Sequence, residues 1–220
     1  VIDHDGTVDK FIGDALMAFW NAPLDVKDHR EKAIHCGRKM FHLLAKLNNE
    51  VMDEGLEELK IGVGINTGDV VVGNMGSDQR FDYTCLGDAV NLSSRLEGQT
   101  KEYRVGIIVG EETTKGIEER FNFVELDKIA VKGKKEGVKI FTILDDTSRC
   151  ANGGDVKHHD TFLSFYRKQH WNRALKMIDL NQITYPELKG YYDMMRERIE
   201  TLKINKPGKG WDTIYRATSK

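Results

Sequence analysis

A Gly-Asp pair between two apolar runs is the strongest constraint on how this chain begins. Gly13 and Asp14 follow Phe11 and Ile12 and precede the apolar residues 15–20. Two apolar runs joined by Gly-Asp are typical of a tight β-hairpin. Such a hairpin places the Asp14 carboxylate at its tip, beyond the sheet, where a hard cation finds an oxygen ligand.

A second motif places an amide and a guanidinium on one helix face. Residues 88–97 are predicted to be helical, and Asn91 and Arg95 are four positions apart within them. Residues at i and i+4 lie on the same side of a helix. Together with the Asp14 carboxylate, this pair suits the binding of a charged phosphate ester. The plain alternatives are a turn residue at Asp14 and a solvated helix face at Asn91 and Arg95.

Composition excludes several classes of protein. The formal net charge of −2 over 220 residues argues against an obligate nucleic-acid binder. No apolar run approaches the roughly 20 residues that span a bilayer. Cys36, Cys85 and Cys150 have no metal-type spacing and are interpreted as free thiols in a reducing, cytoplasmic compartment. The chain opens on Val1 without an initiator Met, as in a fragment, so an upstream region tethered to the inner membrane is compatible with it.

The order of the predicted elements favours a mixed α+β sheet over a doubly wound parallel one, because hairpins are frequent. Asp28 is predicted to cap a helix that runs to about Glu54 and buries an apolar stripe including Leu47 and Val51. Further predicted elements are a strand pair at 60–66 and 69–74, a helix at 88–97, a strand at 105–109, a helix at 111–120 and a closing strand pair at 123–131 and 138–144.

The chain divides into three parts. Residues 1–144 form the main domain, and residues 145–157 have the composition of a linker. Residues 158–220 form a helical extension with two amphipathic segments, at 161–180 and 186–202. We interpret this extension as a packing or dimer-stabilising appendage.

The glycine-rich stretch 62–68 is not interpreted as a dinucleotide-binding loop. Its spacing is G-x-G-x-x-x-G, and the glycines fall inside a predicted strand rather than between a strand and a helix. Glycine within a strand more often allows a partner helix or backbone to approach closely.

Four motifs together resemble the catalytic domain of class III nucleotidyl cyclases. They are residues 10–14 (KFIGD), 62–68 (GVGINTG), 83–95 (YTCLGDAVNLSSR) and 131–134 (VKGK), and their order and spacing match over residues 1–144. The end of the chain, residues 211–215, resembles more weakly the helical extension of some bacterial cyclases. The resemblance implies a ferredoxin-like mixed sheet with helices packed on one face. It also implies a head-to-tail homodimer with active sites at the subunit boundary.

The resemblance assigns roles to particular residues. Asp14 is implied to be one of two aspartates that hold two Mg²⁺ or Mn²⁺ ions. Asn91 is implied to contact the ribose, and Arg95 and Lys132 the phosphates. Arg80 is a further candidate phosphate contact. An ordinary charged turn remains the alternative for Lys132.

The base is implied to be read by Lys10 and Thr84. Lys10 donates to adenine N1 and the Thr84 hydroxyl accepts from the adenine amino group. The implied function is therefore an adenylate cyclase, which converts ATP to cyclic AMP and pyrophosphate by two-metal phosphoryl transfer. The alternative functions are a guanylate cyclase and a catalytically inert nucleotide-binding or dimerisation module. For Thr84 itself, the alternative is an ordinary strand residue without a role in binding.

One departure from the family pattern affects activity. The second metal aspartate of the family lies in an apolar strand upstream of the hairpin, whereas Asp3, Asp5 and Asp9 lie too near Asp14 and lack that context. We therefore expect the first strand and helices of the fold to be absent and this stretch to be inactive by itself.

Overall fold

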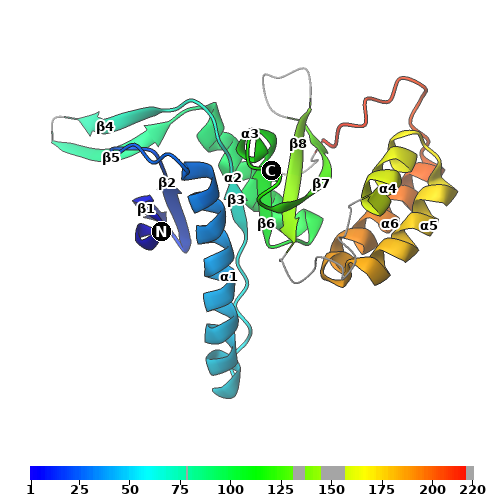
Figure 1. Ribbon diagram of the computed structural model, residues 1–220, viewed down its shortest axis with the longest axis horizontal. Coiled ribbons are helices and arrows are strands. Elements are labelled where there is room, and N and C mark those ends of the chain that lie inside the picture. The colour runs from blue at the N-terminus through cyan, green and yellow to red at the C-terminus, as the bar shows by residue number, and fades with distance from the viewer. Residues whose placement is uncertain (78, 131–136, 145–156, 217–220) are drawn as a thin grey trace.

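The protein combines a central mixed sheet with two separate β-hairpins and a helical C-terminal region (Figure 1). The computed structural model describes residues 1–77, 79–130, 137–144 and 157–216. In chain order the elements are η1 (Ile2–His4), β1 (Thr7–Ile12), β2 (Ala15–Phe19), α1 (His29–Asp53), β3 (Val63–Ile65), β4 (Val71–Ser77), β5 (Arg80–Leu86), α2 (Asp88–Tyr103), β6 (Ile107–Gly110), α3 (Glu111–Thr114), β7 (Asn122–Ile129), β8 (Val138–Leu144), α4 (Lys157–Arg167), α5 (Trp171–Thr184), η3 (Pro186–Leu188) and α6 (Lys189–Ile204).

The central sheet has the order β3-β6-β8-β7. β3 is parallel to β6, whereas β8 runs antiparallel to both β6 and β7. All four residues of β6 are buried, as expected for a strand covered on both faces. The predicted mixed α+β fold is confirmed, but the predicted pairing of 60–66 with 69–74 is wrong, because β3 pairs with β6.

Two hairpins stand apart from this sheet. β1 and β2 pair through a turn in which Gly13 adopts a left-handed φ of 65°, and this confirms the hairpin predicted around Gly13 and Asp14. β4 and β5 form a long antiparallel ribbon that projects from the side of the molecule (Figure 1). The sequence did not predict β5 as a strand.

Helices cover both faces of the sheet at β3, whereas the expectation placed them on one face. A Cβ added at Gly64 would lie 2.3 Å from the Ser93 carbonyl oxygen, so α2 packs directly on that face. The neighbouring side chains Val63 and Ile65 point the other way and lie against Gly37 of α1. The predicted role of glycine in this strand, close approach of a helix, is confirmed.

Helix bounds agree with the sequence in part. α1 begins after Asp28 and ends before Glu54, as predicted. Its second half, however, leaves Leu47 44% exposed, because this part of the helix extends past the sheet (Figure 1). α2 continues to Tyr103, beyond the predicted end near Glu97, and α3 is shorter than predicted.

The C-terminal region contains three principal helices where the sequence predicted two helical segments. The first predicted segment is broken between α4 and α5, where Gln169 has a φ of 59°. The apolar faces of these helices join α2 and the sheet in one hydrophobic core. Its buried members include Leu92, Leu96, Tyr103, Val124, Leu126, Phe162, Ile178, Tyr191, Met195 and Ile199. The helical region is thus integrated with the preceding domain, and the predicted linker 145–157 lies outside the described residues except for Lys157.

Candidate functional site

The two predicted base-reading residues meet at a shared carboxylate. Lys10 lies on β1 and Thr84 on β5, in separate hairpins. The Thr84 hydroxyl donates a hydrogen bond to Asp9 Oδ2, and Lys10 Nζ lies 3.3 Å from Asp9 Oδ1. One carboxylate therefore brings an ammonium and a hydroxyl together from two parts of the chain.

This carboxylate is fully withdrawn from solvent. The Asp9 side chain is 0% exposed, whereas the Lys10 side chain is 38% exposed. Burial raises the pKa of the neighbouring Cys85 thiol, and the Asp9 charge raises it further. Thr84 is itself buried, so this contact joins the two hairpins in an environment with little water.

Asp14 occupies the exposed turn between β1 and β2, as predicted. Among the described residues, no group of three or more His, Cys, Asp or Glu side chains is placed to hold a metal ion. The described residues therefore do not complete a two-ion site around Asp14. Mg²⁺ usually keeps several waters and takes only one or two protein carboxylates, which is compatible with a single ligand from Asp14.

α2 presents Asn91 and Arg95 to solvent. Both residues are exposed, while Leu92 and Leu96 on the opposite side of the helix are buried in the core. The start of α2 is fixed by a hydrogen bond of 3.0 Å from Asn66 Nδ2 to the Ala89 carbonyl oxygen. The predicted pairing of Asn91 and Arg95 on one helix face is therefore what the structure shows.

The remaining predicted phosphate contacts are not described at side-chain level. Lys132 lies outside the described residues, and Arg80 begins β5 with its backbone paired to Ser77. In the part of the chain that the structure describes, no hydrogen bond or ion pair joins Asp14 to Asn91 or Arg95. Within one chain, the described residues therefore bring Lys10 and Thr84 together at Asp9 and bond Asp14 to neither Asn91 nor Arg95.

Sequence reasoning missed Asp9 as a part of this site. Asp9 is the extra residue of a β-bulge, since Val8 pairs with Ala18 and Lys10 with Met17. A bulge redirects side chains out of simple alternation, and its position is not readable from the apolar pattern. Only the adjacency of Asp9 to Lys10 was available as a signal.

The catalytic-domain profile of adenylate and guanylate cyclases matches residues 3–145 of the chain. The chain belongs to this family. A curated relative, adenylate cyclase 1 of Rhizobium meliloti (strain 1021), is 34% identical over 144 residues, which are 66% of this chain and 22% of the relative. The chain spans between 10% and 28% of the length of the first curated cyclases that it matches.

Solved cyclase structures share the fold. The adenylyl cyclase CyaB of P. aeruginosa is 34% identical with a TM-score of 0.60, over 66% of this chain and 74% of that one. A guanylyl cyclase structure is 31% identical with a TM-score of 0.58, over 70% of this chain and 76% of that one. Because the chain is similar to both adenylyl and guanylyl cyclases, these similarities do not distinguish ATP from GTP as the substrate, and the choice rests on the residues of the site.

Proposed function

We propose that this chain is the catalytic region of an adenylate cyclase, which closes ATP to cyclic AMP and releases pyrophosphate. The observation that carries the proposal is the shared contact of Lys10 and Thr84 with Asp9. It places an N–H donor beside a hydroxyl, and adenine offers an acceptor at N1 beside a donor at its amino group. Guanine offers the opposite polarity at these positions, which would leave buried polar groups unpaired.

The reaction is an intramolecular displacement. The ribose 3′-oxygen attacks the α-phosphorus, a new P–O bond forms, and the bond to the pyrophosphate oxygen breaks. Arg95 offers a planar fork of donors to the phosphate oxygens as negative charge develops on them. Asn91, one helical turn earlier, contacts the ribose and orients its 3′-oxygen. Positioning of this kind accounts for much of the catalysis of phosphoryl transfer.

We also propose that Asp14 is a ligand of Mg²⁺ or Mn²⁺. Two such ions, when bound, favour ionisation of the 3′-hydroxyl and neutralise charge on the triphosphate. Because the described residues do not complete a two-ion site, residues 1–220 alone are expected to bind nucleotide without cyclising it. Cyclic AMP formation well above background by purified residues 1–220 would contradict this expectation.

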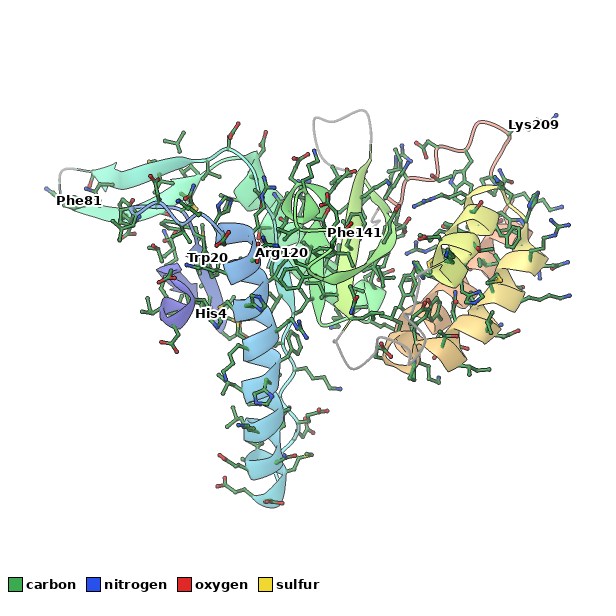
Figure 2. The ribbon with its side chains drawn as sticks, viewed as in Figure 1. His4, Trp20, Phe81, Arg120, Phe141 and Lys209 are labelled. Atoms are coloured by element: carbon green, nitrogen blue, oxygen red, sulfur yellow. The ribbon has the colours of Figure 1, made fainter. Side chains whose placement is uncertain are left out.

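A head-to-tail homodimer completes the proposal. The two hairpins carry exposed apolar side chains, among them Phe11 (74% exposed), Val71 (67%) and Phe81 (62%). Figure 2 shows Phe81 near the free end of the β4–β5 ribbon, far from the central sheet. Exposed apolar side chains at this density are typical of an interaction surface. A second copy seated there would bring its own site residues towards the Asp14 hairpin.

The test of base choice is a pair of nucleotide titrations. Isothermal titration calorimetry with the α,β-methylene analogues of ATP and GTP avoids turnover. Lys10→Glu is expected to weaken binding of the ATP analogue and to raise the affinity for the GTP analogue relative to that for the ATP analogue. Lys101→Glu, on the exposed end of α2, is the matched charge change away from the base. An unchanged affinity ratio in Lys10→Glu would show that Lys10 does not read the base.

A further inference from the structure

Asp9 is a fully buried carboxylate for which the family motifs supplied no role. The bulge in β1 sets its side chain between the two hairpins, with 0% of that side chain exposed. An ionised group in such a place is strongly destabilising unless other polar groups compensate it. Its partners therefore indicate what the group does.

The two Asp9 oxygens are used unequally. Oδ2 accepts the Thr84 hydroxyl, whereas Oδ1 has no hydrogen-bond partner among the described residues. Lys10 Nζ lies 3.3 Å from Oδ1 as an ion pair without hydrogen-bond geometry. The N–H donors of the Lys10 ammonium are thus available to another acceptor, while the charge of Asp9 holds the ammonium in position.

The bond to Thr84 settles where the hydroxyl hydrogen points. A threonine hydroxyl has one hydrogen and two lone pairs, so it donates or accepts as its surroundings require. An ionised carboxylate only accepts. The hydrogen of Thr84 is therefore committed to Asp9, and only lone pairs remain for a ligand.

We propose that Asp9 is a positioning residue that sets base specificity through Thr84. By holding the hydroxyl hydrogen, Asp9 makes Thr84 an obligate acceptor, which suits the 6-amino group of adenine and rejects the 6-carbonyl group of guanine. Without Asp9 the same hydroxyl turns and donates to a carbonyl. This inference rests on the proposed function, because it requires the purine to lie at Lys10 and Thr84.

The experiment compares five forms of the full chain by isothermal titration calorimetry with the α,β-methylene analogues of ATP and GTP. They are the wild type, Asp9→Asn, Thr84→Val, Thr84→Ser and the double variant Asp9→Asn with Thr84→Val. The asparagine amide both donates and accepts, so it no longer commits the Thr84 hydrogen. Valine keeps the shape of threonine without its hydroxyl, and serine keeps the hydroxyl.

The expected result is a change in the ratio of the two affinities. Asp9→Asn and Thr84→Val each reduce the preference for the ATP analogue about fivefold or more, in line with the loss of one matched polar contact. Thr84→Ser keeps the wild-type ratio within about threefold. The double variant matches Thr84→Val within about twofold, because Asp9 acts through the hydroxyl.

Several outcomes overturn the inference. A wild-type ratio in Asp9→Asn, or a further drop of the ratio when Asp9→Asn is added to Thr84→Val, shows that Asp9 does not act through Thr84. If Asp9→Asn fails to fold by circular dichroism, the two Thr84 variants decide. Retention of the preference for the ATP analogue in both Thr84→Val and Thr84→Ser overturns the inference, because Asp9 then has no hydroxyl through which to act. Loss of that preference in Thr84→Val but not in Thr84→Ser supports the inference. A wild type that binds neither analogue, or both equally, refutes the proposed function as well.

Discussion

The guanidinium carbon of Arg198 lies 4.2 Å from the centroid of the Tyr215 ring. The same guanidinium lies 5.3 Å from the centroid of Tyr103, and its Nη1 lies 2.5 Å from Asp127 Oδ2. One side chain of α6 therefore contacts α2, β7 and the C-terminal segment at once. Burial raises the pKa of Asp127, and the opposing charge of Arg198 lowers it, so the two groups depend on each other.

Replacing Arg198 with methionine is expected to destabilise the fold by about 3–5 kcal/mol, because it leaves the buried Asp127 carboxylate without its counter-charge. Urea denaturation followed by circular dichroism measures the change. Adding Asp127→Asn should restore part of the loss. Arg196→Met removes a more exposed ion pair with Asp179 and should cost less than about 1 kcal/mol. Equal losses of unfolding free energy in Arg198→Met and Arg196→Met would contradict a special contribution of the buried Arg198–Asp127 ion pair.

Stability should fall in mildly acidic solution because of His159. Its ring is buried, bonded to the Tyr192 hydroxyl and the Glu125 carbonyl, and burial lowers its pKa from 6.5 to about 4. Between these values the unfolded chain takes up a proton that the folded chain does not. The folded state therefore loses up to about 3 kcal/mol as the pH falls from about 6.5 to 4, and none above that window.

Urea midpoints at several pH values test this prediction. His159→Gln should be less stable at neutral pH but should show a flatter dependence between pH 4 and 6.5. His158→Gln, an exposed neighbour on α4, should keep the wild-type dependence. A steep slope that survives in His159→Gln would place the titrating group elsewhere.

Arg95→Ala should lower kcat much more than it raises KM, by about 10²–10³-fold, if its contact strengthens as charge develops on the phosphate. The measurement needs a form of the protein that cyclises ATP. Ser94→Ala is a neighbouring exposed change on α2 and should leave both constants near wild type. An effect of Arg95→Ala on KM alone would assign the residue to ground-state binding.

Phe81→Asp should weaken self-association by putting a charge on the exposed ribbon. Light scattering across a concentration series is expected to show a shift from dimer to monomer. Leu24→Asp introduces the same charge at a side chain that is 76% exposed but lies outside both hairpins. A dimer unaffected by Phe81→Asp, or weakened equally by Leu24→Asp, would argue against an interface on the β4–β5 ribbon.

Local signals in the sequence predicted the local structure well. The Gly13 turn and the bounds of α1 follow from residues that are close in the chain. β3 was predicted as a strand, but its partner was predicted wrongly, because the strand that pairs with it is parallel and lies more than forty residues away in the sequence. The exposed second half of α1 shows the same limit, since an apolar stripe does not reveal where the sheet ends.

The sequence motifs named candidate site residues but not the contacts around them. Motifs named Lys10, Thr84, Asn91 and Arg95 as candidates. The structure places Lys10 on β1 and the Asn91–Arg95 pair on α2, as predicted, whereas β5, which carries Thr84, was not predicted as a strand. The motifs did not identify Asp9, because its contact with Thr84 depends on a bulge and on a partner 75 residues away.

Among the described residues, none of the helices combines the length and the apolar character that a membrane span requires.

The family match ends at residue 145, but the hydrophobic core does not. Side chains of α4, α5 and α6 share that core with β7 and the C-terminal end of α2: the Arg198 guanidinium carbon lies 5.3 Å from the centroid of the Tyr103 ring, and Tyr191 Oη donates to the Leu126 carbonyl oxygen at 2.8 Å. A gene fusion at the family boundary would separate buried side chains of β7 and the end of α2 from the C-terminal helices that complete their core. A chimeric protein that takes residues 3–145 from this chain is therefore expected to be stable only when it also keeps the C-terminal helices.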